Sequence, residues 1–363
     1  MSRWIQFTKQ TTSIEQLGEP MNVIESLPDG PLDIVGDVHG EWSALQALLG
    51  HLGYRDDGSH PSGRTLIFVG DLVDRGEDSP AVLNWVLPKV VAGRVICVIG
   101  NHELNLIRSD PKEGNGWFFD HNHDHEKGKF LDAPSLKPQQ RGAILAALNR
   151  LPIAAERADL RIVHACWDPA SLATLLETAA LHSGWADCFD HYHRLQDEQL
   201  EAIRAHADFD GEDQQFQALD KLSDEAIKRH LPAAFPQLVR YQQTEQNGNP
   251  VRVLTSGQEE PADQAFHAGG KPRLLRRVRW WNRYTDRPAV VYGHHWRKAT
   301  DAVGPAQWYG EAGNAYCVDF SVGQRFKQRA TGSAAYANGR LAALRWPEAK
   351  VVFDDGEVVQ TIR

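Results

Sequence analysis

The sequence has little cysteine and no long apolar run. Its four cysteines form neither a CxxC pair nor the spacing of a zinc ribbon; they are Cys97, Cys166, Cys188 and Cys317. This pattern argues against a disulfide framework and favours small buried thiols in a reducing compartment. No stretch approaches the roughly 20 apolar residues of a membrane-spanning helix. The first 16 residues, MSRWIQFTKQTTSIEQ, lack the apolar segment of a signal peptide. We therefore expect a soluble cytoplasmic protein.

Basic clusters are also missing. The net charge is −9, and acidic and basic residues alternate along the chain without a Lys/Arg-rich block or tail. This distribution favours neither nucleic acid nor an anionic membrane as a partner. Hydrophobic residues make up 42% of the 363 positions, which is ample for a large core. The length fits two domains or one large α/β domain.

Short apolar runs alternate with helical patterns in the first half of the chain. Runs typical of buried strands lie at residues 31–38, 64–71, 94–101 and 160–165. Helical spacing follows the first run, and Ser79 and Pro80 mark the start of a helix after the second, with Ser79 as N-cap. This order predicts α/β layering with a largely parallel or mixed sheet.

The middle of the chain lacks the alternation of strands and helices, and strand-like runs then occur again. Residues 111–140 are polar and indicate a long loop, whereas residues 170–245 are mostly helical in pattern. Further strands are predicted at residues 251–257, 289–295 and 315–320, and an antiparallel hairpin at 340–346 and 351–359. We therefore predict a single domain over residues 1–363, with 170–250 as a mainly helical insertion.

Polar residues gather where the predicted strands end. The segments are GDVHG (36–40), GDLVDRG (70–76), GNHE (100–103), VHA (163–165) and GHH (293–295). One such histidine is usually structural, and one such aspartate is often a helix N-cap. Five such segments, each at the carboxyl end of a predicted strand, predict a single site. Ligands of open α/β sheets bind beyond the carboxyl ends of the strands. Carboxylates, imidazoles and an amide suit Mn²⁺, Fe or Zn²⁺.

In this order, the five segments resemble the motifs of the calcineurin-like metallophosphoesterase superfamily. The DRG ending and the late GH resemble its branch of phosphoprotein phosphatases and symmetrical diadenosine tetraphosphatases. The segments 100–119, 251–261 and 276–284 resemble a bacterial subgroup of that branch. The resemblance implies an α/β fold (four layers, α+β) with a central β-sandwich of mixed sheets flanked by helices. It also implies a dinuclear metal site at the carboxyl ends of the strands, with the helical insertion as a candidate cap.

The resemblance implies two divalent metal ions, with Mn²⁺ expected and Fe or Zn²⁺ as alternatives. Asp37 and His39 would hold the first ion, and Asp71 would bridge both. The second ion would take the remaining ligands, which are Asn101, His164 and His294. Such a pair activates water and clamps a phosphoryl group, so the implied reaction is direct attack of metal-bound hydroxide without a phosphoenzyme.

The resemblance also assigns roles to three residues beside the metals. His102 would protonate the leaving alkoxide, and Asp74 would orient it. Arg75 would hold the phosphate, and Asn101 and His102 would also contact the substrate. The alternatives are structural: Asp74 as a helix cap or an ion-pair partner of Arg75, and Arg75 in a surface ion pair.

Other segments leave alternatives open. HNHDHE (121–126) fits a third metal site or, better, a solvated lid segment. In KPRLLRRVRWWNRY (271–284), Trp280 and Trp281 could stack bases, although core packing is favoured. The family's second phosphate-binding arginine stays open among Arg273, Arg276, Arg277 and Arg279. VDFSVG (318–323) stands where diadenosine tetraphosphatases tend to have a DTG-type segment.

Three functions compete. The leading hypothesis is a phosphomonoesterase acting on a phosphoprotein (Ser/Thr) or on a small phosphate ester. The alternative is a nucleotide pyrophosphohydrolase, such as a diadenosine tetraphosphatase, in which the tryptophans stack a base. The third is a non-catalytic binding or scaffold protein, which the presence of every matched ligand position disfavours.

Overall fold

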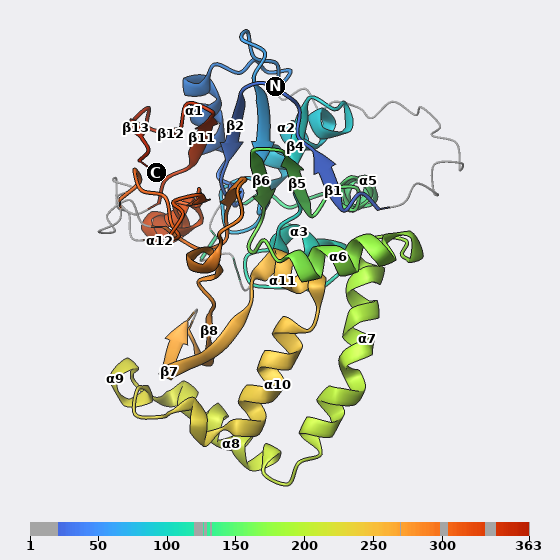
Figure 1. The fold of residues 1–363 in the computed structure, drawn as a ribbon, viewed down its shortest axis with the longest axis vertical. Coiled ribbons are helices and arrows are strands. Elements are labelled where there is room, and N and C mark those ends of the chain that lie inside the picture. Colours follow the sequence, from blue (N-terminus) through green and yellow to red (C-terminus); the bar gives the residue numbers. More distant parts are fainter. Residues whose placement is uncertain are drawn as a thin grey trace.

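The computed structural model describes residues 21–119, 126, 129–130, 133–268, 270–297, 304–330 and 339–362. Two mixed β-sheets form the core, one with six strands in the order β13-β12-β11-β2-β3-β4 and one with five in the order β1-β5-β6-β9-β10. A separate two-stranded hairpin lies in an arm that extends from the core (Figure 1). The layered α/β architecture expected from the sequence is confirmed.

The six-stranded sheet joins strands from the first third of the chain to the three C-terminal strands. Its members are β2 (Leu32–Val35), β3 (Thr65–Phe68), β4 (Val95–Cys97), β11 (Ala342–Trp346), β12 (Lys350–Phe353) and β13 (Val358–Gln360). β2, β3 and β4 are parallel, whereas β11 is antiparallel to both β2 and β12. The predicted C-terminal hairpin is therefore confirmed, with a turn that divides its second half into β12 and β13.

The five-stranded sheet contains the other strands that carry motifs. Its members are β1 (Ile24–Ser26), β5 (Ala154–Arg157), β6 (Leu160–Val163), β9 (Ala289–Tyr292) and β10 (Ala315–Cys317). β6, β9 and β10 are mutually parallel. Because parallel strands end at the same edge, the residues that follow β6, β9 and β10 emerge together.

The interior between the two sheets is apolar. One buried cluster combines Ile34 and Ile67 of the six-stranded sheet with Ile162, Val291 and Tyr316 of the five-stranded sheet. A larger cluster joins the outer sides to helices that include α1 (Trp42–Leu52), α2 (Ser79–Val91), α3 (Asn101–Ile107) and α5 (Pro138–Leu148). This arrangement is the predicted sandwich flanked by helices. All four cysteines are buried and free, as the sequence indicates.

The chain between β6 and β9 builds the arm. Its elements are α6 (Pro169–Thr178), α7 (Trp185–Arg204), α8 (Phe209–Ala218), α9 (Asp224–Ile227), α10 (Pro236–Asn247), α11 (Pro250–Ser256), β7 (Glu259–Ala268) and β8 (Lys271–Arg277). The far part of the arm has its own apolar cluster, which includes Phe235, Leu238 and Leu274. Within the described part of the chain, no helix has both the length and the apolarity of a membrane span.

Two local expectations need correction. Residues 251–257 were predicted to form a strand, but they lie in helix α11 and the turn that ends it. The Asn249 side chain accepts from the backbone N–H groups of Val251 and Arg252, and Pro250 follows this N-cap, so capping outweighs the β-branched composition. The N-cap of α2 is Asp78 rather than Ser79, because the Asp78 carboxylate accepts from Ala81 N–H.

Candidate metal centre

The structure brings together all six residues expected to bind metal. Nε2 of His39 lies 3.9 Å from the carboxylate of Asp37 and 3.8 Å from that of Asp71. The same Asp71 oxygen, Oδ2, lies 3.3 Å from Nε2 of His164. Asp71 thus belongs to two groups of possible ligands, one with His39 and His102 and one with His164 and His294. A shared carboxylate between two clusters is the arrangement that a dinuclear centre requires.

Unusual backbone conformations aim these side chains. His39, Asp71, Asp74, Arg75 and His294 all have positive φ, with values from 48° to 75°. Residues other than glycine rarely adopt this left-handed region, at a cost on the order of 1–3 kcal/mol each. Strain of this kind concentrates at functional sites, where the surrounding structure holds it. Here it turns the chain sharply where strands β2, β3 and β9 have just ended.

Two glycines of the motifs allow close approach around the carboxylates. A Cβ atom at Gly293 would lie 2.0 Å from Oδ1 of Asp37, and one at Gly100 would lie 2.3 Å from Oδ1 of Asp71. Both distances are impossible for real atoms, so these positions exclude every side chain. The requirement explains why glycine precedes the ligand in GHH and in GNHE.

Backbone carbonyl groups fix the orientation of two imidazoles. Nδ1 of His164 lies 2.8 Å from the carbonyl oxygen of Val69, and Nδ1 of His39 lies 3.2 Å from that of Val73. A neutral ring that donates from Nδ1 presents the lone pair of Nε2 to the site. Such second contacts of ligand histidines are typical of metal centres.

The surroundings of Asn101 fit a cation. Its inward-facing amide atom lies 3.2 Å from Nε2 of His164, 2.8 Å from Nδ1 of His294 and 3.3 Å from the carbonyl oxygen of Thr255. With an amide oxygen in this place, acceptor atoms from three side chains converge. Nε2 of His294 has no hydrogen-bond partner among the described residues. A divalent ion would satisfy the converging lone pairs, so the residues present fit the metal.

Buried charges interact strongly in the site. Burial alone would raise the pKa of Asp71, but His164 and His102 outweigh it and hold this pKa well below its ordinary value. Burial alone would lower the pKa of His164, but Asp71 raises it to about 10. Burial and the neighbouring Asp319 raise the pKa of Asp37 well above its ordinary value. A buried set of this kind needs positive charge, which bound cations would supply.

His102 and Arg75 lie at the same site as the possible ligands His39 and Asp71. Nδ1 of His102 is 2.6 Å from Oδ2 of Asp74, while the other Asp74 oxygen accepts from the indole N–H of Trp117 at 2.7 Å. The guanidinium of Arg75 lies 3.1 Å from Nε2 of His102 and 3.3 Å from Nε2 of His39. Neither structural alternative for Asp74 is observed, since it pairs with His102 and Asp78 caps the helix.

The sequence interpretation missed two buried carboxylates of the site. Glu103, the last residue of GNHE, accepts from the backbone N–H groups of Gly100, Asp71 and Leu72 and thus ties two motifs together. Asp319, in VDFSVG, is 1% exposed, and its Oδ2 has no partner among the described residues. Burial together with Asp71 raises the pKa of Glu103 to about 7 and that of Asp319 to about 6. In the sequence, Glu103 and Asp319 could have been noticed because each follows an apolar run that is typical of a strand.

Several candidates lie elsewhere. His295 turns away from the ligands, with Nε2 3.1 Å from the carbonyl oxygen of Ala165. Trp280 is buried and donates to that same oxygen, and Trp281 stacks on Tyr292, so these tryptophans pack against the core. In HNHDHE, residues 121–125 lie outside the described residues, whereas Glu126 accepts from Gly114 and Gly116 N–H groups.

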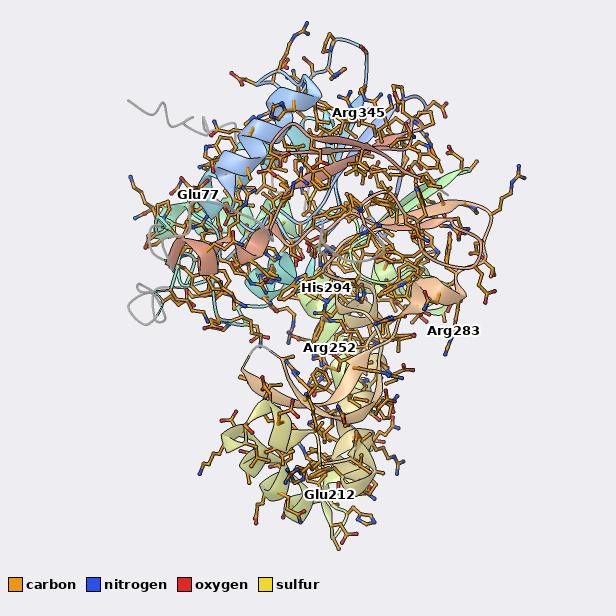
Figure 2. The ribbon with its side chains drawn as sticks, turned by 90° about the vertical axis from the view of Figure 1, so that its left-hand side faces the viewer. Glu77, Glu212, Arg252, Arg283, His294 and Arg345 are labelled. Carbon is orange, nitrogen blue, oxygen red and sulfur yellow. The ribbon has the colours of Figure 1, made fainter. Side chains whose placement is uncertain are left out.

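The arginines of residues 271–284 differ in the groups that they contact. Arg277 is exposed and donates to the backbone carbonyl oxygen of His294 at 3.0 Å, which places it beside the ligand groups. Arg276 instead pairs with Glu260 and Asp263 on the surface of the hairpin. Figure 2 shows His294 where the arm leaves the core, with Arg252 nearby and Glu212 at the far end of the arm.

Two curated relatives each match about a fifth of the chain. A bis(5'-nucleosyl)-tetraphosphatase (asymmetrical) from Anoxybacillus flavithermus is 44% identical over 79 residues, 21% of this chain and 32% of its own length. A symmetrical one from Ralstonia nicotianae is 40% identical over 77 residues, 21% of this chain and 24% of its own length. The chain thus spans a third or less of these two relatives.

Solved structures resemble the fold over most of the chain. A cold-active protein-tyrosine phosphatase from a Shewanella species shares 13% identity, with a TM-score of 0.48 over 96% of this chain and 85% of that one. A serine/threonine phosphatase from Saccharomyces cerevisiae shares 15% identity, with a TM-score of 0.44 over 96% and 86%.

The family profile described as calcineurin-like phosphoesterase matches residues 30–294, which include the six expected ligands and both His102 and Arg75. This match covers most of the chain and agrees with the two sheets and with the ligand groups at their strand ends. The chain belongs to the calcineurin-like phosphoesterase family.

Proposed function

We propose that this protein is a metal-dependent phosphomonoesterase that hydrolyses its substrate by direct attack of water. The observation that carries the proposal is the Asp71 carboxylate, which two ligand groups share beside the His102–Asp74 pair. Two divalent ions, with Mn²⁺ preferred, would activate the water and clamp the phosphoryl oxygens when bound at Asp37, His39, Asp71, Asn101, His164 and His294.

The chain's own residues would complete the reaction. Water adds to phosphorus and loses a proton to solvent, the ester P–O bond breaks, and the leaving oxygen takes the proton from Nε2 of His102. A proton from solvent then restores His102, so the net products are the alcohol and hydrogen phosphate. Asp74 supports this role because its carboxylate lies 2.6 Å from Nδ1 and fixes the orientation of the ring, with Nε2 toward the site. General acid catalysis of this kind contributes on the order of 10²–10⁴ in rate.

Two arginines would bind the phosphate from different sides. Arg75 already reaches between His39 and His102, and its planar fork matches two phosphoryl oxygens. We assign Arg277 as the second phosphate-binding arginine, because it lies at the backbone of His294 and forms none of the surface ion pairs of Arg276. Asn101 and His102 would contact the substrate from the helix N-terminus of α3.

The arm is proposed to act as a cap within one domain. It leaves the core after β6 and returns before β9, so both of its ends adjoin strands that carry His164 and His294. Arg277, at the end of β8, brings the arm's hairpin directly to the site. The arm would thereby limit the size and shape of the group attached to the phosphate.

Nucleotide pyrophosphate hydrolysis is the second candidate. The names of the relatives from Anoxybacillus and Ralstonia support it, since both are tetraphosphatases, although each matches only 21% of this chain. Base stacking by Trp280 and Trp281 no longer supports it, because their rings pack against the core.

A hydrolysis panel with Mn²⁺ tests the proposal. It contains p-nitrophenyl phosphate, bis(p-nitrophenyl) phosphate, a phosphoserine peptide and diadenosine tetraphosphate, with the Asp71→Asn variant as control. We expect monoester turnover that requires Mn²⁺ and disappears in the variant. Preference for the tetraphosphate would instead establish the second candidate. An absence of turnover, together with fewer than one bound metal ion per chain, would support a non-catalytic role.

A further inference from the structure

One tryptophan stands apart from all other aromatic residues of the described chain. Trp296 is 49% exposed, and among the described residues it is the only exposed phenylalanine, tyrosine or tryptophan. A single exposed aromatic side chain is not unusual by itself, so the position of Trp296 decides whether it has a role. It follows the proposed ligand His294 by two residues.

The neighbours of Trp296 hold it in place. His295 is buried against Ala165, and its ring also contacts Trp281 edge-on at 4.8 Å between ring centres. On the other side, Arg297 is 1% exposed and donates to the carbonyl oxygens of Gly304 and Gln307. With both adjacent residues anchored, the Trp296 backbone is fixed, and the indole projects into water from a rigid support. A preorganised ring of this kind loses little entropy when a ligand binds.

The indole also lies next to the proposed phosphate-binding group. The guanidinium carbon of Arg75 is 5.9 Å from the centre of the Trp296 ring, within the range of a cation–π contact. The same guanidinium is 3.1 Å from Nε2 of His102. Because Arg75 contacts both His102 and the indole, an ester whose phosphate binds Arg75 can bring its alcohol group to Trp296.

We propose that Trp296 forms a stacking site for a planar ring carried by the alcohol group of the substrate. The substrate class is then a phosphate ester of an aromatic alcohol or of a nucleoside, rather than of an aliphatic alcohol. The inference rests on the proposed phosphomonoesterase function and adds selectivity to it. Stacking on an aromatic side chain tolerates any flat ring, because it depends on the π-face and not on hydrogen bonds.

A matched pair of substrates isolates the effect of ring planarity. Benzyl phosphate and cyclohexylmethyl phosphate have leaving groups of similar size and basicity, but only the first carries a flat ring. We expect the wild-type enzyme to prefer benzyl phosphate in kcat/KM. Trp296→Ala should lower kcat/KM for benzyl phosphate about tenfold and that for cyclohexylmethyl phosphate about threefold or less, whereas Trp296→Phe should keep most of the preference. A second pair, adenosine 5'-monophosphate and ribose 5-phosphate, distinguishes a nucleobase from a simple aryl group.

A tryptophan remote from the site serves as control. Trp85 on α2 contacts the Lys89 ammonium at 4.0 Å, so it has a similar cation contact without access to the centre. We expect Trp85→Phe to leave the ratio of the two kcat/KM values unchanged. Equal losses for both substrates in Trp296→Ala would overturn the proposal, because they would indicate only a displaced Arg75.

Binding without turnover separates this inference from the proposed function. Benzylphosphonate and cyclohexylmethylphosphonate can be titrated calorimetrically against the Mn²⁺-loaded protein. A preference for the benzyl compound that is lost in Trp296→Ala supports the stacking site even if no ester is hydrolysed. Equal affinities in the wild-type protein would contradict it, while turnover of p-nitrophenyl phosphate would still support the phosphomonoesterase.

Discussion

Nδ1 of His102 lies 2.6 Å from Oδ2 of Asp74, and both groups are almost completely buried. The opposite nitrogen of the ring faces Arg75 at 3.1 Å, toward the ligand groups. The imidazole is therefore held on one side by a carboxylate and directed on the other at the proposed phosphate. This arrangement suits the proton donor proposed above, because the ring is fixed at Nδ1 and its Nε2 is directed toward the site.

The His102→Asn substitution should separate catalysis from metal binding. We expect the variant to keep its metal content and to lose turnover of benzyl phosphate by about 10²–10⁴-fold, because the proton donor is removed. The loss should be smaller for p-nitrophenyl phosphate, whose leaving group needs less protonation. Metal analysis and steady-state kinetics provide the two measurements, with Asp71→Asn as the variant expected to lose metal as well. Wild-type rates of alkyl phosphate hydrolysis in His102→Asn would refute the role of this residue.

The hydrogen bond from Trp117 to Asp74 can be tested by substitution. Trp117→Phe keeps an aromatic ring but removes the indole N–H that donates to Oδ1 of Asp74 at 2.7 Å. A buried carboxylate oxygen is then left without its donor, which costs about 1–3 kcal/mol in the free energy of unfolding. Urea unfolding measures this loss. A stability unchanged within error would show that the bond contributes little.

Arg277 and Arg276 form a matched pair of adjacent residues. Arg277→Ala should raise KM for small phosphate esters and the inhibition constant of inorganic phosphate about tenfold, since a charge-assisted contact contributes about 1.5–3 kcal/mol. Arg276→Ala should change neither, because this side chain pairs with Glu260 and Asp263 on the hairpin surface. Equal effects of the two substitutions would indicate a general contribution of charge and not a specific contact.

The sequence predicted which side chains meet at the strand ends better than it predicted the arm, for a physical reason. The expected ligands follow short, buried strands, and parallel neighbours in a sheet end at the same edge, so Asp37 and Asp71 meet after β2 and β3, and His164 and His294 meet after β6 and β9. Asp319 was less visible, because a single aspartate after β10 is no different from a surface residue until the sheet order places it beside Asp37.

The arm shows where pattern reading fails. The run from Val251 to Ser256 has the composition of a strand, yet Asn249 and Pro250 start a helix there. Likewise, the two strands β7 and β8 are largely exposed, so no apolar alternation marks them in the sequence. Their pairing depends on the packing of β7 and β8 against α10, a tertiary contact that local patterns do not contain.

The metal-free protein should lose stability as the pH rises from 7 to 9. The pKa of His164 is raised to about 10, so its stabilisation is complete below its unfolded value and is lost as the pH rises toward 10. The pKa values of Glu103 and Asp319 are raised to about 7 and about 6, which acts in the same direction. Between pH 5 and pH 7 these effects are opposed by three buried histidines with lowered pKa values, which are His39, His294 and His295, so the net loss is expected above pH 7.

Thermal unfolding at pH 7, 8 and 9 tests this dependence. We expect the melting temperature of the chelator-treated protein to fall across the series, and the increase on adding Mn²⁺ to be largest at high pH, because metal binding releases protons. A metal-free melting temperature that rises from pH 7 to pH 9 would contradict the assigned shifts.

Asp319→Asn should have opposite effects on the metal-free and metal-loaded protein. The substitution keeps the shape of the side chain but removes a buried charge beside Asp37, whose pKa it raises. Relief of this repulsion should raise the melting temperature of the metal-free protein at pH 8 by about 2 °C. Metal affinity should instead fall about 10–100-fold, because the free Oδ2 of Asp319 can accept a hydrogen bond from water in the coordination sphere. Calorimetric titration with Mn²⁺ and unfolding in chelator measure the two effects. A variant that is less stable in both states would show that Asp319 serves the fold alone, since only a carboxylate directed at the metals couples the two changes with opposite sign.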